Sequence, residues 1–294
     1  MLFKPWSEFE RAPRHALSED YQDEDPLTSN KVPSFKFSQN VSSTQDLEIN
    51  RKNPLIVAPY NLKFVLDALP VTKSIIASIT ITKGRKSDEG STTTTTSVND
   101  DDDDDGYLQD QQLYSATGQS EAFSTFVVDI LSLEGLQINV VAMPNFTNSH
   151  PMINNQLTRY LIEQILSPEN ILLLSPCCIN YNESLGKVIN FSHDAPLAQK
   201  FANISFLKPP HFVSGITASV MSFATLKNIP TVNLVLDSEG VANFERINED
   251  SVLEIIQVLG KDYFKFDQTQ YKKFRDVAVK KSSLNDYVTS GMYI

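Results

Sequence analysis

The chain has 294 residues, of which 41% are hydrophobic, so it can bury a sizeable core and is not a wholly disordered protein. The formal net charge is −11, but fourteen of the carboxylates lie in two short stretches, 19–25 and 88–110, which leaves the rest nearly neutral. No stretch approaches the roughly 18 apolar residues of a membrane span, and the first residues lack the apolar core of a signal peptide. We therefore expect no membrane partner, and we expect the acidity to lie in solvated loops.

The two cysteines are neighbours, Cys177 and Cys178. Adjacent cysteines make neither a useful disulfide staple nor a metal-ligand spacing, so we expect both to be small buried apolar residues in a reducing compartment, the cytoplasm or the nucleus. The sequence contains no glycine-rich phosphate loop, no dinucleotide fingerprint and no paired histidines, and it predicts no cofactor and no metal.

Residues 1–50 mix Pro, Ser, Asp and Gln with isolated apolar groups. This pattern indicates an arm that lies along the body, with Trp6, Phe35 and Phe37 as its anchors. A single domain is expected over 51–281, beginning with a short apolar strand at 55–58.

The stretch 73–83 alternates between apolar and polar residues, which predicts a strand with one buried face. Ile75, Ala77, Ile79 and Ile81 are expected on that face. Residues 84–110 then combine a threonine run with six successive aspartates and predict a disordered insertion, because like charges repel and few apolar groups offset the ordering entropy.

The remaining elements alternate between strand and helix. Strands are predicted at 112–117, 123–131, 136–143, 171–174, 188–191 and 231–236, and helices from Ser149 to near Pro168, from Ser214 to Leu226, at 249–259 with Gly260 as C-cap, and at 268–280. The pattern favours an α/β fold in three layers, in which helices flank a mixed sheet whose antiparallel part comes from the N-terminal half.

Two stretches resemble catalytic sites only weakly. Ser192-His193-Asp194 contains the residue types of a catalytic triad, but triads assemble from positions that are distant in sequence. Ser238-Glu239-Gly240 ends a predicted strand, where α/β sheets bind ligands. A structural turn is the preferred interpretation of this segment, and a hydrolase or nucleoside phosphorylase site at Ser238 and Glu239 is the alternative.

The last five residues are unusual for a chain end, because they are apolar and aromatic. Ser290 and Gly291 provide backbone freedom, and Met292, Tyr293 and Ile294 follow. A free carboxylate next to an aromatic ring with a polar tip makes a compact docking tag. The expected tail is residues 282–294, flexible and ending in a hydrophobic-Tyr-X motif.

Four segments occur in an order that resembles a known family. They are Met1-Leu2-Phe3-Lys4-Pro5-Trp6, Pro209-Pro210-His211-Phe212-Val213-Ser214-Gly215, Ser238-Glu239-Gly240 and Ser290-Gly291-Met292-Tyr293-Ile294. Together they resemble the fungal proteasome assembly chaperone 1 family, whose terminal trio more often begins with Leu than with Met.

The resemblance implies a chaperone without catalysis, built on a fold like that of the purine nucleoside phosphorylases and hydrolases. It implies a heterodimer with a second assembly chaperone subunit, in the cytoplasm and also the nucleus. The partner would be the α ring of 20S core particle precursors, where Met292, Tyr293 and Ile294 enter the pocket between the fifth and sixth α subunits. Such a protein helps the ring to assemble and blocks premature binding of the regulatory particle.

The sequence leaves a second binding mode open and argues against a third. Met292-Tyr293-Ile294 also fits a terminus captured by a PDZ domain through strand addition, which would make the protein an adaptor. The helix at 268–280 carries several lysines but no aromatic residues interleaved on its charged face, so we expect no nucleic-acid binding.

Overall fold

The computed structural model describes residues 34–84, 125–146, 151–179, 183–192, 195–240 and 245–290. Nearly all of these residues belong to one compact unit, formed by Lys36–Thr82 and Ser124–Ile294. The described strands are β1 (Ser34–Val41), β2 (Leu55–Pro59), β3 (Lys73–Gly84), β4 (Thr125–Leu133), β5 (Ile138–Met143), β6 (Ile171–Cys177), β7 (Leu185–Ile189), β8 (Thr231–Glu239) and β9 (Arg246–Ile247).

The described helices are α2 (Thr44–Asn50), α3 (Lys63–Asp67), α5 (Pro151–Arg159), α6 (Pro196–Gln199), α7 (Gly215–Leu226), α8 (Glu249–Gln257) and α9 (Gln268–Ser290). A 3₁₀ turn, η3 (Tyr60–Leu62), precedes α3, and π-helical turns η4 (Tyr160–Ile165) and η5 (Val258–Tyr263) extend α5 and α8. Over these residues, no helix is long and apolar enough to cross a membrane.

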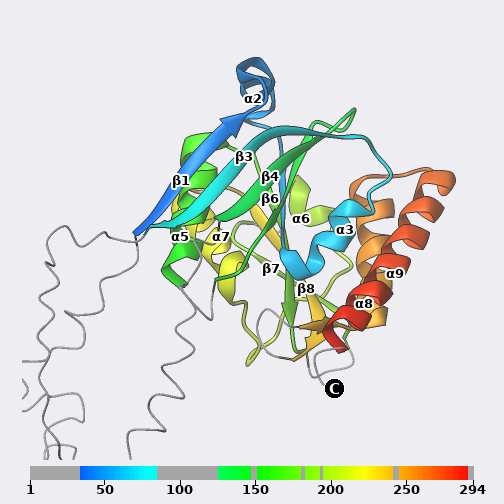
Figure 1. Ribbon diagram of the computed structural model, residues 1–294. Coiled ribbons are helices and arrows are strands. Elements are labelled where there is room, and N and C mark those ends of the chain that lie inside the picture. Colours follow the sequence, from blue (N-terminus) through cyan, green and yellow to red (C-terminus); the bar gives the residue numbers. More distant parts are fainter. Residues whose placement is uncertain are drawn as a thin grey trace, which may run out of the picture. The chain divides into compact units, whose positions relative to one another are not determined.

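The strands form one mixed sheet in the order β1-β3-β4-β5-β2-β6-β8-β7, with β9 paired to the end of β8. β5, β2, β6 and β8 run parallel, whereas β4 is antiparallel to both β3 and β5, and β7 is antiparallel to β8. Helices cover both faces, with α5 and α7 on one side of the sheet and α3, α8 and α9 on the other (Figure 1). The predicted α/β fold, with a mixed sheet flanked by helices, is therefore confirmed; β3 and β4 give the expected antiparallel part, but β7 and β9 add antiparallel strands from the C-terminal half.

The central strands are apolar on both faces because each face lies under a helical layer. All five residues of β2 are buried, and successive side chains pack on opposite faces of the sheet. Ile56 and Ala58 pack in the cluster that contains Phe274 and Ala278 of α9, while Leu55 and Val57 point to the opposite face. Burial of each of the larger side chains, Leu55, Ile56 and Val57, stabilises the fold by about 1.5–3 kcal/mol relative to exposure.

The strand β3 departs from the predicted alternation at its start. Its register with β4 shifts between Ile75 and Ala77, so Ile75 is 49% exposed and Ile76 is only 2% exposed. Ala77, Ile79 and Ile81 are buried as predicted. The expected place of Ile75 on the buried face is wrong, because a bulge inserts one extra residue and reverses the side chains before it.

Two helix ends also differ from the prediction. Gly260 does not cap a helix but lies inside η5, where a Cβ atom would come within 2.8 Å of Cδ2 of Tyr271. The glycine therefore permits close packing of η5 against α9. In turn α9 continues through Ser290, well past the expected end at Lys280, because neither Pro nor Gly interrupts the chain before Gly291.

Part of the predicted arm belongs to the sheet. β1 is the edge strand beside β3, and the ring of Phe37 stacks on Tyr160 with 5.4 Å between the ring centroids. Trp6, the strand expected at 112–117 and the acidic insertion after Gly84 lie outside the described residues, so they stay predictions, as does the division into arm, domain and tail.

Candidate functional site

The carboxyl ends of the parallel strands define one edge of the sheet, and this edge holds the candidate site. α8 starts there, since the backbone N–H of Asn248 donates to the carbonyl of Asp237 at 3.0 Å. α9 then runs antiparallel to α8, so its C-terminal end at Ser290 returns to the same edge (Figure 1). Gly291, predicted to give the tail backbone freedom, and the predicted docking residues Met292, Tyr293 and Ile294 follow Ser290 and lie outside the described residues.

The alternative catalytic pair is not brought together by the fold. Ser238 and Glu239 are consecutive residues of β8, opposite Ile247 and Arg246 of β9. Successive side chains of a strand point to opposite faces, so the Glu239 carboxylate cannot act as the base for the Ser238 hydroxyl. Ser238 is also buried, whereas Glu239 is exposed. Ser192 is described, but His193 and Asp194 are outside the described residues.

A pocket of about 230 Å³ opens at this edge. Three prolines line it, one at the end of β2 (Pro59), one after β5 (Pro144) and one near the end of β6 (Pro176). Proline has no N–H to continue a strand ladder, so these residues help to end neighbouring strands at the same level. The pocket therefore occupies the place where α/β sheets commonly bind ligands.

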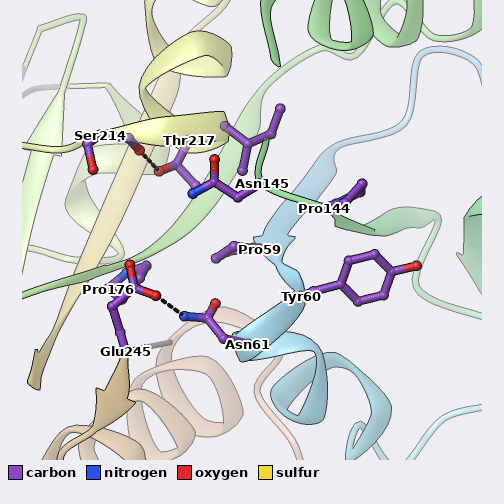
Figure 2. Close-up of a pocket in the computed structure, with 10 residues that line it drawn as sticks. Pro59, Tyr60, Asn61, Pro144, Asn145, Pro176, Ser214, Thr217 and Glu245 are labelled. Carbon is purple, nitrogen blue, oxygen red and sulfur yellow. Dashed lines mark hydrogen bonds between the residues drawn. The ribbon is translucent and has the colours of Figure 1, made fainter. Parts of the chain in front are cut away.

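Two polar groups lie on opposite sides of the pocket, with Pro59 between them (Figure 2). On one side, Nδ2 of Asn61 donates to Oε2 of Glu245 at 3.0 Å. On the other side are Asn145 and the hydroxyl of Thr217, which donates to the carbonyl of Ser214 at 3.1 Å. Oδ1 of Asn61 is buried and accepts no hydrogen bond from the described residues.

The start of α7 is pressed against Asn145. Gly215 has a φ of +66°, and a Cβ atom at this position would lie 2.4 Å from Nδ2 of Asn145. Oδ1 of Asn145 accepts from Nδ2 of Asn154 at 3.1 Å, and Oδ1 of Asn154 accepts from the N–H of Phe146 at 3.0 Å. This chain of amides fixes the loop after β5 to α5 and to the first turn of α7.

One partly exposed aromatic residue lines the pocket, and a second lies in β4 next to the residue that the first one contacts. Tyr60 lines the pocket, is 42% exposed, and donates its hydroxyl to the carbonyl of Val127 at 3.2 Å. Phe126 is 41% exposed and packs edge-on against Phe146, with 5.3 Å between the ring centroids. Aromatic side chains that remain partly exposed next to a polar pocket are typical of surfaces that bind proteins.

Cys177 is the last residue of β6 and Cys178 follows it, and the prediction that both are buried is wrong. Cys177 is half-buried and Cys178 is exposed, because the strand leaves the core at this point. The Cys177 thiol contacts the carbonyl of Phe212 at 3.4 Å, and burial raises the pKa of that thiol. Among the described residues, no group of three or more His, Cys, Asp or Glu side chains is placed to hold a metal ion.

The sequence contains a pattern that indicates this pocket, although it belongs to none of the motifs considered above. Two apolar strands are each followed by Pro and Asn, as Pro59-Tyr60-Asn61 and as Pro144-Asn145. Because the carboxyl ends of parallel strands meet at one edge, the repeated pattern places both amides there. No sequence signal was found for Glu245, which reaches Asn61 from a loop 184 positions later.

The fold is similar to that of several solved structures. Pyrococcus furiosus PbaB, an archaeal proteasome activator, is 6% identical, with 86% of this chain and 98% of that chain covered and a TM-score of 0.49. Pyrococcus furiosus PbaA (monoclinic form), an archaeal homolog of proteasome-assembly chaperone, is 8% identical, with 87% and 93% covered and a TM-score of 0.48. A Thermoplasma acidophilum protein of unknown function is 12% identical, with 85% and 96% covered and a TM-score of 0.43. At these values we draw no functional conclusion from the likeness.

No curated protein matches the sequence. One family model, described as POC1 chaperone, matches residues 1–294 and so covers the chain from its first residue to its last. This match agrees with the resemblance in the terminal and internal segments, and the chaperone assignment rests on it. The separation of the Ser238 and Glu239 side chains is consistent with that assignment. The chain therefore belongs to the POC1 chaperone family.

Proposed function

We propose that this protein acts as one subunit of a heterodimeric chaperone that binds the α ring of 20S core particle precursors. Its tail enters the pocket between the fifth and sixth α subunits, aids ring assembly and keeps the regulatory particle away until assembly is complete. The observation that carries the proposal is the family match over 1–294, which includes the terminal trio.

The chemistry of the trio supports this role. The carboxylate of Ile294 pairs with a lysine of the α-ring pocket, and a charge-assisted hydrogen bond of this kind is roughly twice as strong as a neutral one. Tyr293 inserts its ring and leaves its hydroxyl at the polar rim, while Met292 covers the apolar wall. The protein works in the cytoplasm and the nucleus, where precursors of this particle are available to it.

The length of α9 limits how far the trio can reach. The trio begins two residues after Ser290, and residues 291–294 span at most about 13 Å when fully extended. The folded body must therefore come close to the ring before the trio can enter a pocket. Contacts of the body then add to the affinity, because the tail binds within an already formed complex.

Truncation tests the proposal directly. We expect removal of residues 292–294 to lower the recovery of 20S precursors by at least about tenfold, equivalent to 1.4 kcal/mol, because the carboxylate and two anchors are lost together. The measurement is affinity capture of assembly intermediates by the tagged chain, co-produced with its partner subunit. Met292→Leu is the matched control and should retain capture, since the leucine side chain fills a similar space.

Equal capture by the truncated and full-length proteins would contradict the proposal. Two alternatives predict different results in the same experiment. An adaptor that binds PDZ domains would recover membrane-scaffold proteins in place of α subunits. An enzyme at Ser238 and Glu239 would lose turnover in Glu239→Gln and would be unaffected by the truncation.

A further inference from the structure

Several large apolar side chains at the carboxyl edge of the sheet remain exposed to solvent. They are Tyr60, Phe126, Met152 and Phe212, and we call these four residues the apolar patch. Exposed apolar side chains that occur singly are normal on a protein surface, whereas a group of them in one region marks a site that binds another molecule. The contacts beneath the four side chains show that they belong to one region.

Tyr60 and Phe126 meet at the start of β4. This strand runs antiparallel to β5, so its first residues lie beside the carboxyl end of β5. The Tyr60 hydroxyl donates to the carbonyl of Val127 at 3.2 Å, and Val127 directly follows Phe126. Phe126 packs edge-on against Phe146, which comes shortly after β5. Both rings are therefore held by contacts within the protein and remain partly exposed.

Met152 and Phe212 lie in two segments that the same amide joins. Nδ2 of Asn154, two residues after Met152 in α5, donates to Oδ1 of Asn145 at 3.1 Å. Gly215, three residues after Phe212, is packed against the same Asn145 side chain. Since Asn145 also lines the pocket at the carboxyl edge, the apolar patch surrounds that pocket.

Phe212 is the most exposed member of the patch, at 75%, and its backbone is held in place. Its carbonyl lies 3.4 Å from the thiol of Cys177, the last residue of β6. The N–H of His211 donates to the carbonyl of Lys208 at 3.1 Å. A held backbone loses less conformational freedom when another molecule covers the ring, which favours binding. Tyr, Phe and Met are also the apolar residues that protein interfaces are enriched in.

The start of the tail indicates which molecule covers the patch. α9 ends at the same edge of the sheet (Figure 1), and the residues 291–294 that follow it span at most about 13 Å. A protein that takes the end of the tail therefore comes within this distance of the end of α9. Its surface then faces the carboxyl edge, where the patch lies.

We propose that the apolar patch is the part of the folded body that lies against the α ring, beside the crevice that takes the tail, and that it covers an apolar strip of the ring's surface. The inference rests on the proposed function for the identity of the ring. The two contacts support each other, because the tail holds the ring close to the patch and raises its effective concentration there.

Site-specific photo-crosslinking tests which molecule covers the patch. Phe212 is replaced by p-benzoylphenylalanine, which keeps an aromatic side chain, in the full chain co-produced with its partner subunit. We expect light to join this position to an α subunit. A crosslink to the partner subunit in its place, or no crosslink, would overturn the proposal.

Leu226 is the matched control position for the crosslink. It is 78% exposed and lies at the other end of α7, a helix of 12 residues and so about 18 Å long. The same replacement at Leu226 should give no crosslink to an α subunit. Equal crosslinking from both positions would show that the ring has no preference for the carboxyl edge.

Polar substitution measures what the patch contributes. We expect the double variant Met152→Ser, Phe212→Ser to lower capture of 20S precursors at least about fivefold, and Leu226→Ser to leave it unchanged. Recovery of the partner subunit should be unchanged in all variants, and its loss in the double variant would assign the patch to the heterodimer instead. Unchanged thermal unfolding verifies that lost capture is not lost folding, since all three side chains are exposed.

The truncation of residues 292–294 separates this inference from the proposed function. If the truncation lowers capture and the double variant does not, the tail binds the ring and the role of the patch is wrong. If the double variant lowers capture and the truncation does not, the patch binds the ring and the role of the tail is wrong.

Discussion

Lys187 in β7 is a cation inside the core with no carboxylate among its described contacts. It is only 5% exposed, its Nζ donates to the carbonyl of Phe201 at 2.7 Å, and the same atom lies 4.8 Å from the ring centroid of Phe206. Burial lowers the pKa of this lysine below its usual 10.5. One hydrogen bond and one aromatic ring therefore replace the water around the ammonium group of Lys187, and they recover only part of its solvation free energy.

This burial predicts a pH-dependent stability. Between the folded pKa of Lys187 and its unfolded value of 10.5, the unfolded chain binds more protons, so the free energy of unfolding rises with pH. Lys187→Met removes this contribution. We expect the stability of the unaltered protein, relative to Lys187→Met, to increase as the pH rises from 7 towards 10, measured by urea unfolding. A difference that is constant with pH would contradict the prediction. Tyr263, whose pKa burial raises to about 12, acts in the opposite direction and only at higher pH.

Gly215 allows a second test at the scale of one residue. Its φ of +66° costs any other L residue about 1–2 kcal/mol, and a Cβ atom would also displace Asn145 from its hydrogen bond with Asn154. Gly135 is the matched control, because it has a φ of +81° and nothing within 4 Å of an added Cβ atom. We expect Gly215→Ala to lower the free energy of unfolding by at least about 1 kcal/mol more than Gly135→Ala. Equal losses in chemical denaturation would show that the contact with Asn145 is unimportant.

At the scale of elements, the bulge in β3 leaves Ile75 half exposed and Ile76 buried, so the two residues contribute differently to stability. Ile76→Ala should lower the free energy of unfolding by about 2–4 kcal/mol, because it leaves a cavity in the core. Ile75→Ala should cost less than about 1 kcal/mol, since that side chain is half exposed. Urea unfolding of the two variants makes the comparison within one strand. Strict alternation predicts the opposite order, so the result decides which register the strand adopts.

The same elements show how much the sequence predicts. Continuous apolar runs correctly predicted β2 and β6, because a strand that is buried on both faces is apolar at successive positions. The bulge at Ile75 could not be predicted, since it depends on pairing with β4 across the insertion. Gly260 was misinterpreted for a similar reason: its role is set by the Tyr271 ring, and periodicity contains no information on packing between helices.

The candidate site was predictable in part. Asn61 and Asn145 each come shortly after a Pro at the end of an apolar strand. The two strands, β2 and β5, are parallel neighbours, so the residues that follow them lie close together. Glu245 joins them only through the pairing of β9 with β8, a contact between short segments that no local pattern encodes. The terminal trio was identified by its chemistry, and its binding role is still a prediction.

At the scale of the whole molecule, the candidate site and the end of α9 share one edge of the sheet. Phe274 and Ala278 bury α9 in the core, and Nζ of Lys281 lies 3.7 Å from Oδ2 of Asp67 in α3. This exposed ion pair adds little to stability, so the apolar contacts hold the helix in place. The direction of the last described turn is therefore tied to the sheet, and with it the starting point of the tail.

The helical backbone that continues to Ser290 has a further consequence. Because α9 is one continuous helix from Gln268 to Ser290, a displacement of its buried part around Phe274 and Ala278 also displaces Ser290. Under the proposed function, a core substitution in α9 would therefore impair binding to the α ring without changing any residue of the tail.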